Sequence, residues 1–274
     1  MIRIALQSHV IEGRISMSKI SEAFKNKKAF IPFVTCGDPD LATTKKIVIE
    51  LEKNGADLVE LGIPFSDPTA EGPVIQGANI RALSNGITTD DIFAMVQDLR
   101  NTVHIPLVFM TYANVVFSYG MDRFFENCKT VGIDGIILPD VPFEEKEEFE
   151  SVASEYGIDF ISMIAPTSED RIDKIASSAK GFIYIVSSLG VTGTRNEITS
   201  DIKAVVDRVR KNTEVPCAVG FGISTPEQAA KMAEVSDGAI MGSAIVKVIE
   251  KYKGEAPKYV GELTKSIKEA YHAS

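Results

Sequence analysis

Short apolar runs alternate with longer amphipathic stretches along nearly the whole chain. The apolar runs are four to six residues long, and most are bounded by Gly, Pro, Asp or Asn. Such a run is typical of a strand that is buried on both faces. The pattern therefore predicts eight strands, at residues 30–35, 58–61, 107–111, 135–138, 159–164, 182–186, 216–219 and 238–241.

The stretches between these runs have helical periodicity. Ile20, Ala23 and Phe24, for example, share one face of a helix predicted within residues 18–28. Further helices are predicted at residues 41–54, 75–84, 90–100, 121–131, 144–156, 169–177, 198–211, 226–233, 244–252 and 259–270.

Eight strands that are each followed by a helix, without a break in composition, predict one α/β domain. Its expected architecture is a single parallel (β/α)8 TIM barrel. Three helices are additional to the eight units: one at the N-terminus, one after the second strand and one at the C-terminus. A doubly wound open sheet is the alternative, but it does not require eight units of such regular length.

The first residues differ in character from the rest of the chain. Ile11-Glu12-Gly13-Arg14 spells a familiar engineered protease site, and Met17-Ser18-Lys19 reads as a natural start. We therefore expect residues 1–16 to be a non-native leader and residues 17–274 to form the barrel domain. A native N-terminal arm is the alternative.

Composition and charge narrow the classes of function. Hydrophobic residues make up 45% and charged residues 24% of the chain, the ordinary range of soluble globular proteins. The net charge of −9 argues against nucleic acid or an anionic membrane as partner. Cys36, Cys128 and Cys217 are widely spaced, which indicates reduced thiols in a cytoplasmic protein.

The histidines and lysines exclude several mechanisms. The only histidines are His9, His104 and His272, and none has another His or Cys at metal-ligand spacing, so we expect no metal site. A Ser-His-Asp mechanism lacks a suitable histidine for the same reason. Lys180 precedes the sixth predicted strand and no predicted strand carries a lysine, which argues against a Schiff base. Asp, Glu and Tyr remain as acid–base candidates.

The second predicted strand carries a carboxylate, Glu60, near its carboxyl end. In a TIM barrel the active site lies in the loops after the strands. If Leu58 and Glu60 share the inward face, Glu60 lies at the top of the barrel interior, where burial raises a carboxyl pKa and suits a general acid. A structural carboxylate paired with a neighbour is the alternative. Asp67 and Glu71 follow in the loop, where carboxylates are mostly solvated or cap a helix.

Glycines follow the last two predicted strands. Gly220-Phe221-Gly222-Ile223-Ser224 comes after the seventh and Gly242-Ser243-Ala244 after the eighth. Backbone N–H groups of such loops and a helix N-terminus bind anions, so these loops predict a phosphorylated ligand. Tyr184 is expected to point inward near Glu60, although a buried Tyr is more often part of the core. Residues 189–195 suit a mobile lid or an ordinary surface loop.

Four motifs together resemble the tryptophan synthase alpha subunit family, and the resemblance runs from about Met17 to the C-terminus. They are Phe33-Val34-Thr35-Cys36-Gly37-Asp38-Pro39, Glu60-Leu61-Gly62-Ile63-Pro64-Phe65-Ser66-Asp67-Pro68, Gly190-Val191-Thr192-Gly193 and Gly220-Phe221-Gly222-Ile223-Ser224. The resemblance implies retro-aldol cleavage of indole-3-glycerol phosphate to indole and glyceraldehyde 3-phosphate, in the pathway of tryptophan biosynthesis.

The resemblance also implies roles for individual residues. Glu60 matches the acid–base glutamate and Tyr184 an active-site tyrosine. Glu71 stands where the family usually has Asp, which stabilises the charge developing at the indole N–H. The positions that match residues around indole, on the lid or at the phosphate are Phe33, Ile75, Tyr112, Thr192, Gly193, Gly222, Gly242 and Ser243.

A partner is implied as well. The family's alpha subunit passes indole to a beta subunit that carries pyridoxal phosphate, in an α2β2 assembly, and this chain itself is expected to need no cofactor. The expected contact residues are Pro64, Asp67, Asn114 and Asp140.

Three other functions remain open from the residues. The chain could be a stand-alone indole-glycerol-phosphate lyase. It could also be another phosphate-binding barrel, such as a phosphoribosyl isomerase, but that class should carry paired acid–base groups on strands 1 and 5. The third alternative is a non-catalytic subunit that activates a partner, which the unusual Glu71 keeps open.

Overall fold

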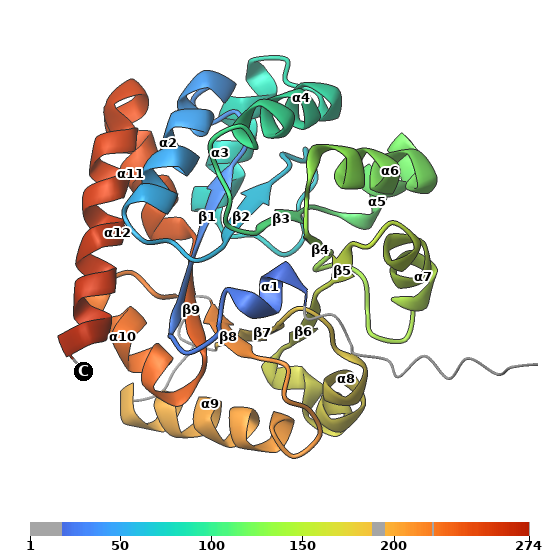
Figure 1. Cartoon of the computed structure of the whole chain (residues 1–274), viewed down its shortest axis with the longest axis vertical. Coiled ribbons are helices and arrows are strands. Elements are labelled where there is room, and N and C mark those ends of the chain that lie inside the picture. The colour runs from blue at the N-terminus through green and yellow to red at the C-terminus, as the bar shows by residue number, and fades with distance from the viewer. Residues whose placement is uncertain (1–17, 188–194, 221, 274) are drawn as a thin grey trace, which may run out of the picture.

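The computed structural model describes residues 18–187, 195–220 and 222–273, and they form a ring of helices around a ring of strands (Figure 1). All strand pairs are parallel, and the order within the sheet is β5-β4-β3-β2-β1-β9-β8-β7-β6. The strands are β1 Ala29–Thr35, β2 Val59–Gly62, β3 Leu107–Met110, β4 Gly135–Ile137, β5 Asp159–Phe160, β6 Ser162–Ile164, β7 Ile183–Val186, β8 Cys217–Gly220 and β9 Gly238–Met241.

The sheet closes into a barrel through Ile161, which joins β5 to β6. The two short strands occupy the two edges of the sheet but follow each other directly in the chain. The predicted single strand at residues 159–164 is therefore two strands, because β5 pairs with β4 while β6 pairs with β7. The strands of a barrel are tilted and staggered, so a strand meets its two neighbours at different heights along its length. The segment at residues 159–164 therefore pairs with β4 in its first part and with β7 in its last part. The predicted TIM barrel is confirmed.

Helices alternate with the strands and cover the outside of the barrel (Figure 1). The predicted additional helices after β2 and at the C-terminus are among them, whereas the one at the N-terminus covers the amino end of the barrel interior (Figure 1). The helices are α1 Lys19–Glu22, α2 Leu41–Lys53, α3 Pro73–Ser84, α4 Thr89–Leu99, α5 Ala113–Tyr119, α6 Met121–Val131, α7 Glu147–Glu155, α8 Ile172–Ser178, α9 Arg195–Val209, α10 Pro226–Val235, α11 Ser243–Tyr252 and α12 Ala256–Ala273, with 3-10 turns η1 Pro166–Arg171 and η2 Lys253–Glu255. None of the helices in these ranges is long and apolar enough to span a bilayer.

Three helices differ clearly from the sequence prediction. The helix predicted at residues 169–177 starts within the 3-10 turn η1 and is α-helical only from Ile172. The N-terminal helix was expected within residues 18–28, but α1 has one turn, and Asn26 takes a positive φ of 58° shortly after it. Helix α5 was not predicted. Its first N–H group, on Ala113, donates to both carboxyl oxygens of Asp140 at 3.1 Å, so a contact from the loop after β4 stabilises its start.

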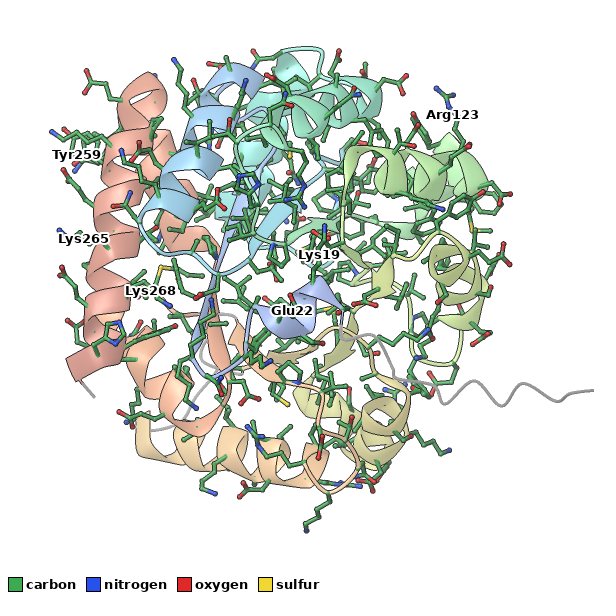
Figure 2. The ribbon with its side chains drawn as sticks, in the orientation of Figure 1. Lys19, Glu22, Arg123, Tyr259, Lys265 and Lys268 are labelled. Atoms are coloured by element: carbon green, nitrogen blue, oxygen red, sulfur yellow. The ribbon has the colours of Figure 1, made fainter. Side chains whose placement is uncertain are left out.

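The core has an inner and an outer part, and strand alternation separates them. In β1, Ala29 and Ile31 pack inside the barrel, whereas Phe30 and Val34 pack against the helices. Helix α1 closes the amino end of the interior, where Ile20 joins the inner cluster. Charged side chains such as those of Arg123 on α6 and Lys265 on α12 project outward from the helices (Figure 2).

Aspartates tie neighbouring strands together at this amino end. Three aspartates that lie just before strands each accept a hydrogen bond from a backbone N–H group of the neighbouring strand. Asp57 accepts from Phe30 at 2.8 Å, Asp134 from Leu107 at 3.0 Å and Asp237 from Cys217 at 2.8 Å. Such contacts satisfy backbone donors that the strand ladder leaves unpaired. The amino end is thereby braced, while the carboxyl end is left to the loops that carry function.

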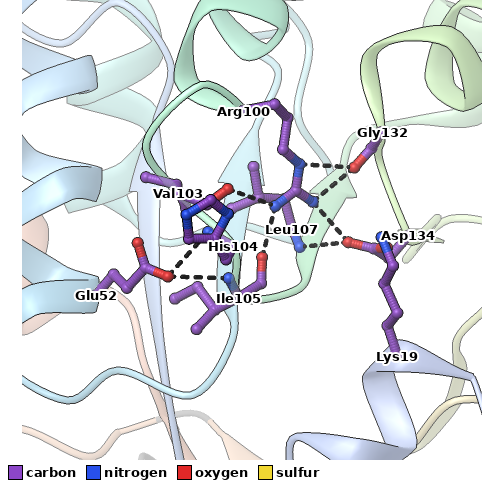
Figure 3. A network of polar contacts seen from close by, with 9 residues as sticks. All are labelled: Lys19, Glu52, Arg100, Val103, His104, Ile105, Leu107, Gly132 and Asp134. Carbon is purple, nitrogen blue, oxygen red and sulfur yellow. Dashed lines mark hydrogen bonds and ion pairs between the residues drawn. The ribbon is translucent and has the colours of Figure 1, made fainter.

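Arg100 is the centre of the largest of these braces (Figure 3). Its guanidinium donates to the carbonyl of Gly132 at 2.6 and 2.9 Å, to the carbonyl of Ile105 at 2.7 Å and to Asp134 at 2.6 Å. Glu52 accepts from the backbone N–H of Ile105 at 3.1 Å on the other side of the same turn. One planar cation thus links the turns that enter β3 and β4.

Candidate active site

Glu60 lies inside the barrel near the carboxyl end of β2. It is 1% exposed, and its register partners on the flanking strands are Phe33 and Val108. Burial raises the pKa of the carboxyl from 4.5 to about 8. Its Oε1 atom has no hydrogen-bond partner among the residues that the structure describes. The group is thus mostly protonated at neutral pH and has an oxygen available to a ligand.

Tyr184 on β7 is also inside the barrel, as predicted. It belongs to the inner cluster with Leu58. Burial raises the pKa of its hydroxyl well above the usual value, and the charge of Glu60 raises it further. The ring lies against Gly220 of β8, because a Cβ atom at that glycine would come within 2.3 Å of the tyrosine Oη. Glycine at position 220 therefore makes room for the tyrosine.

Glu71 is half-buried at the end of the loop after β2. Its Oε2 accepts a hydrogen bond of 2.7 Å from the side-chain amide of Asn79, and its backbone carbonyl accepts one of 2.8 Å from Gln76. Burial raises the pKa of the carboxyl, while hydrogen bonds from Asn79 and Tyr112 lower it. Glu71 directly precedes Gly72, the N-cap of α3, and its carboxyl accepts from the Asn79 side chain of that helix.

Tyr112 connects the loops that follow β2 and β3. It is buried, its hydroxyl accepts from the N–H of Ala70 at 3.1 Å, and its ring lies 5.2 Å from that of Phe65. Burial raises the pKa of the hydroxyl to about 12, and the charges of Glu71 and Asp140 contribute. The residue helps to hold the loop that carries Glu71.

Phe33, Ile75 and Gly242 meet at one place on the barrel rim. Phe33 packs with Ile75 of α3, and a Cβ atom at Gly242 would lie 3.6 Å from both side chains. A Cβ atom at Gly62 would come within 2.5 Å of the Phe33 ring, so Gly62 makes room for that ring. The apolar residues predicted to contact indole thus lie beside a residue predicted to bind phosphate.

The predicted phosphate-binding residues lie at a helix start and a turn. Gly242 is the N-cap of α11 and Ser243 its first residue, and no side chain among the described residues caps this end. The N–H groups of a helix N-terminus attract an anion. Gly222 has a φ of 76°, a conformation that favours glycine. Thr192 and Gly193 lie outside the described residues.

The predicted partner-contact residues lie on neighbouring loops at the carboxyl end. Asp67, Asn114 and Asp140 are exposed, whereas Pro64 is buried within the chain. Phe117 on α5 is 63% exposed, and sequence reasoning missed it because this helix was not predicted.

Sequence reasoning missed two further polar groups. Asn79, the partner of Glu71, lies on α3 without any local motif that would mark it. Arg81 on the same helix donates to both oxygens of buried Asp38 at 2.8 Å and to Glu250 of α11 at 2.9 Å. It thereby ties α3 to the loop after β1 and to the helix of the phosphate site. Only contacts between distant segments reveal these roles.

In the described ranges, no group of three or more His, Cys, Asp or Glu side chains could hold a metal ion. A family model described as the tryptophan synthase alpha chain matches residues 20–273 of the sequence. This chain belongs to the tryptophan synthase alpha chain family. The resemblance that the four motifs suggested is thereby confirmed.

Individual relatives of the family agree over nearly the whole chain. A tryptophan synthase alpha chain of Lacticaseibacillus casei is 50% identical over 257 residues, which cover 94% of this chain and 97% of that protein. The crystal structure of the tryptophan synthase alpha subunit from Legionella pneumophila str. Paris has a TM-score of 0.85 at 37% identity, covering 94% of this chain and 100% of that chain.

A structure of the tryptophan synthase α2β2 complex from Pyrococcus furiosus is also similar. Its matching chain has a TM-score of 0.79 at 32% identity and covers 89% of this chain and 99% of that chain. Tryptophan synthase alpha chains are lyases that cleave indole-3-glycerol phosphate to indole for the beta subunit, and the beta subunit carries the pyridoxal phosphate.

Proposed function

We propose that this chain cleaves indole-3-glycerol phosphate by a retro-aldol reaction in which Glu60 is the general acid and then the general base. The observation that carries the proposal is the carboxyl of Glu60, buried in an apolar barrel interior with a pKa near 8 and one oxygen without a partner among the described residues. A protonated carboxyl at neutral pH can donate a proton and then accept another.

The proton transfers balance over one turnover. Glu60 gives its proton to C3 of the indole ring, which leaves a cationic indolenine. The carboxylate of Glu60 then takes the proton of the neighbouring glycerol hydroxyl, and the bond between C3 and that carbon breaks. The electrons of this bond restore the indole ring, and the carbonyl of glyceraldehyde 3-phosphate forms. Glu60 is protonated again at the end.

Glu71 stabilises the cation by accepting a hydrogen bond from the indole N–H. The role requires a charged carboxylate. Burial raises the pKa of Glu71, and the hydrogen bonds from Asn79 and Tyr112 oppose that shift and favour the charged form. Glu is one methylene longer than the Asp usual at this position, and Asn79 holds the carboxyl of the longer side chain at 2.7 Å.

The rim residues bind the two ends of the substrate. Phe33, Ile75 and Tyr112 lie around the indole ring, and Tyr184 lies beside Glu60 in the interior. The phosphate binds the backbone N–H groups at Gly222, Gly242 and Ser243, where the N-terminus of α11 contributes its dipole. The proposal extends to Thr192 and Gly193 as residues that cover the substrate.

The reaction needs neither a metal ion nor a Schiff base, because the indolenine itself accepts the electrons of the breaking bond. The sequences of β1 to β9 contain no lysine that could form an imine inside the barrel.

The beta subunit contacts the loops that carry Pro64, Asp67, Asn114 and Asp140. Indole passes to that subunit, where pyridoxal phosphate is bound.

We also propose that residues 17–274 form the catalytic domain and that the protein functions in the cytoplasm. The match of the family model to residues 20–273 and the free, buried state of Cys36, Cys128 and Cys217 support these two points.

One assay tests the proposal. The chain is incubated with indole-3-glycerol phosphate, with and without a tryptophan synthase beta subunit, and indole is measured. The wild type should form indole, and Glu60→Gln should lose activity about 100- to 10,000-fold while its circular dichroism spectrum is unchanged. The matched control is Glu155→Gln, at an exposed site on α7, which should behave like the wild type. Wild-type turnover in Glu60→Gln would remove Glu60 from the mechanism.

A further inference from the structure

The barrel has a seam between β4 and β6. The last register pair on this side joins Ile136 of β4 to Phe160 of β5, and Ile161 N–H then donates to the Ile136 carbonyl at 2.9 Å. Within the sheet, β6 pairs with β7 and not with β4. A cavity of about 50 Å³ lies at this seam, and Leu138, Phe160 and Ile175 form part of its apolar wall.

Ser162 gives the cavity an unsatisfied hydroxyl. It lines the cavity and is 4% exposed, and its Oγ has no hydrogen-bond partner in the described part of the chain. The next residue, Met163, lines the cavity and also packs on the inner cluster, so Met163 separates the cavity from the barrel interior. A buried hydroxyl without a partner is costly, which indicates that something in the cavity hydrogen-bonds to it.

Lys146 gives the cavity a buried ammonium group. It lines the cavity and is 7% exposed. Its Nζ lies 2.8 Å from Glu150 Oε2, 3.1 Å from Ser178 Oγ and 5.0 Å from the centre of the Phe143 ring. Lys180 Nζ lies 3.7 Å from the other oxygen of Glu150. Lys180 also acts on the charge of Asp159, so the two cations and two carboxylates balance. Glu150 and Ser178 use two of the three N–H donors of the Lys146 ammonium, and the third can donate to a charged acceptor in the cavity.

The size of the cavity limits the ligand. A cavity of about 50 Å³ has room for a ligand of only a few non-hydrogen atoms. Acetate has four. Its two oxygens match Lys146 and Ser162, and its methyl group matches the apolar wall. A phosphate ion is larger and has more oxygens than these two polar groups can serve.

We propose that the cavity at the seam between β4 and β6 is a binding site for a small aliphatic carboxylate of acetate size, held by Lys146 and Ser162. The site is separate from Glu60 and does not depend on the proposed reaction.

Titration of the whole chain with ¹³C-labelled acetate, in a buffer free of other carboxylates, tests the proposal by NMR. We expect saturable binding in the millimolar range, since a ligand of so few atoms cannot bind tightly. Ser162→Ala should weaken binding about fivefold by removing one hydrogen bond. Lys146→Met should abolish binding by removing the charge. Ser162→Leu should fill the cavity and also abolish it.

The control substitution is Ser177→Leu at an exposed position of α8, which should bind acetate like the wild type. If Ser162→Leu disturbs folding, Ser162→Ala still tests the site, because it is the smaller change. Ser162→Ala should form indole at the wild-type rate. Acetamide, which has the shape of acetate without its charge, should bind at least about tenfold more weakly. Three results would overturn the proposal: no saturable acetate signal in the wild type, equal binding of acetamide, or unchanged binding in both Ser162→Ala and Lys146→Met. A crystal structure soaked in acetate that shows only water in the cavity would also overturn it.

Discussion

The side-chain amide of Asn79 donates a hydrogen bond of 2.7 Å to Glu71 Oε2 and so determines where the second carboxylate of the site points. The two residues lie on different sides of the Gly72 N-cap, with Glu71 in the loop and Asn79 two turns into α3. Asn79 is buried, so its amide is held by packing, and the helix positions the carboxylate.

Removal of this amide should change the pH dependence of the reaction. The hydrogen bond from Asn79 lowers the pKa of Glu71, so Asn79→Ala should raise that pKa. Because the charged form is the active one, indole formation should fall about tenfold near neutral pH and recover partly as the pH rises. A pH profile of kcat/KM measures the shift. A uniform loss at every pH would instead indicate a structural role only, and Asn101→Ala on the exposed turn after α4 is the control.

The length of the side chain at position 71 should matter less than its charge. Glu71→Asp restores the residue usual in the family and should retain most of the activity, whereas Glu71→Ala should lose about 100-fold or more, since it removes the charge that stabilises the cation. Steady-state indole formation distinguishes the two. An equal loss in both variants would show that the pocket is built around Glu.

Burial of Glu60 should make the protein less stable as the pH rises. The pKa is about 8 in the folded chain and near 4.5 when the carboxyl is exposed, so between these values the folded state holds a proton that the unfolded state has lost. The contribution of Glu60 is most favourable below pH 4.5 and is lost progressively up to about pH 8. The slope is at most about 1.4 kcal/mol per pH unit.

Urea unfolding of the wild type and of Glu60→Gln at several values between pH 5.5 and pH 8 measures this effect. Since Gln does not titrate, the variant should lack the slope and should gain stability relative to the wild type as the pH rises. Parallel curves for the two proteins would show that Glu60 is not desolvated in the folded chain.

Arg100 should be important for stability and not for chemistry. It braces the turns that enter β3 and β4 (Figure 3), whereas Glu60 lies near the carboxyl end of β2. Arg100→Ala would remove the donor to the carbonyl of Gly132 and would leave Asp134 with the Leu107 N–H but without its guanidinium partner. It should lower the free energy of unfolding by about 2 to 4 kcal/mol. Arg123→Ala, at a side chain that is 64% exposed, should change it by less than about 0.5 kcal/mol.

Chemical denaturation measures the free energy of unfolding of Arg100→Ala and Arg123→Ala. In the indole assay, each variant should show wild-type turnover once it is folded. A loss of turnover in folded Arg100→Ala would show that the amino end of the barrel influences the site. Arg100→Lys should recover only part of the stability, because an ammonium cannot serve several acceptors in one plane as the guanidinium does.

Local patterns were enough to predict the barrel and the principal acid–base residue. Runs such as that at β2 are apolar because both of their faces are buried, and this signal needs no knowledge of distant contacts. A carboxylate within such a run, Glu60, is conspicuous because burial of a charge is costly. Gly220, at the end of β8, and Gly242, directly after β9, are similarly conspicuous, since each is recognised from its own strand.

Contacts between distant segments decided the rest. The predicted fifth strand is divided at Ile161 because β4 and β7 meet it at different heights, and neither neighbour is visible in its own residues. Helix α5 begins where Asp140 accepts the Ala113 N–H, a contact from the loop after the next strand. Propensity within residues 113–119 does not contain that information.

The sequence by itself determined that this chain forms a barrel with a carboxylate at the end of β2, because a buried strand is recognised from the apolar character of a few adjacent residues. Only the tertiary structure decided how completely Glu60 is desolvated and that Glu71 is held by Asn79. The pKa of a carboxyl depends on what surrounds it in space, and in this fold those groups come from different strands and helices.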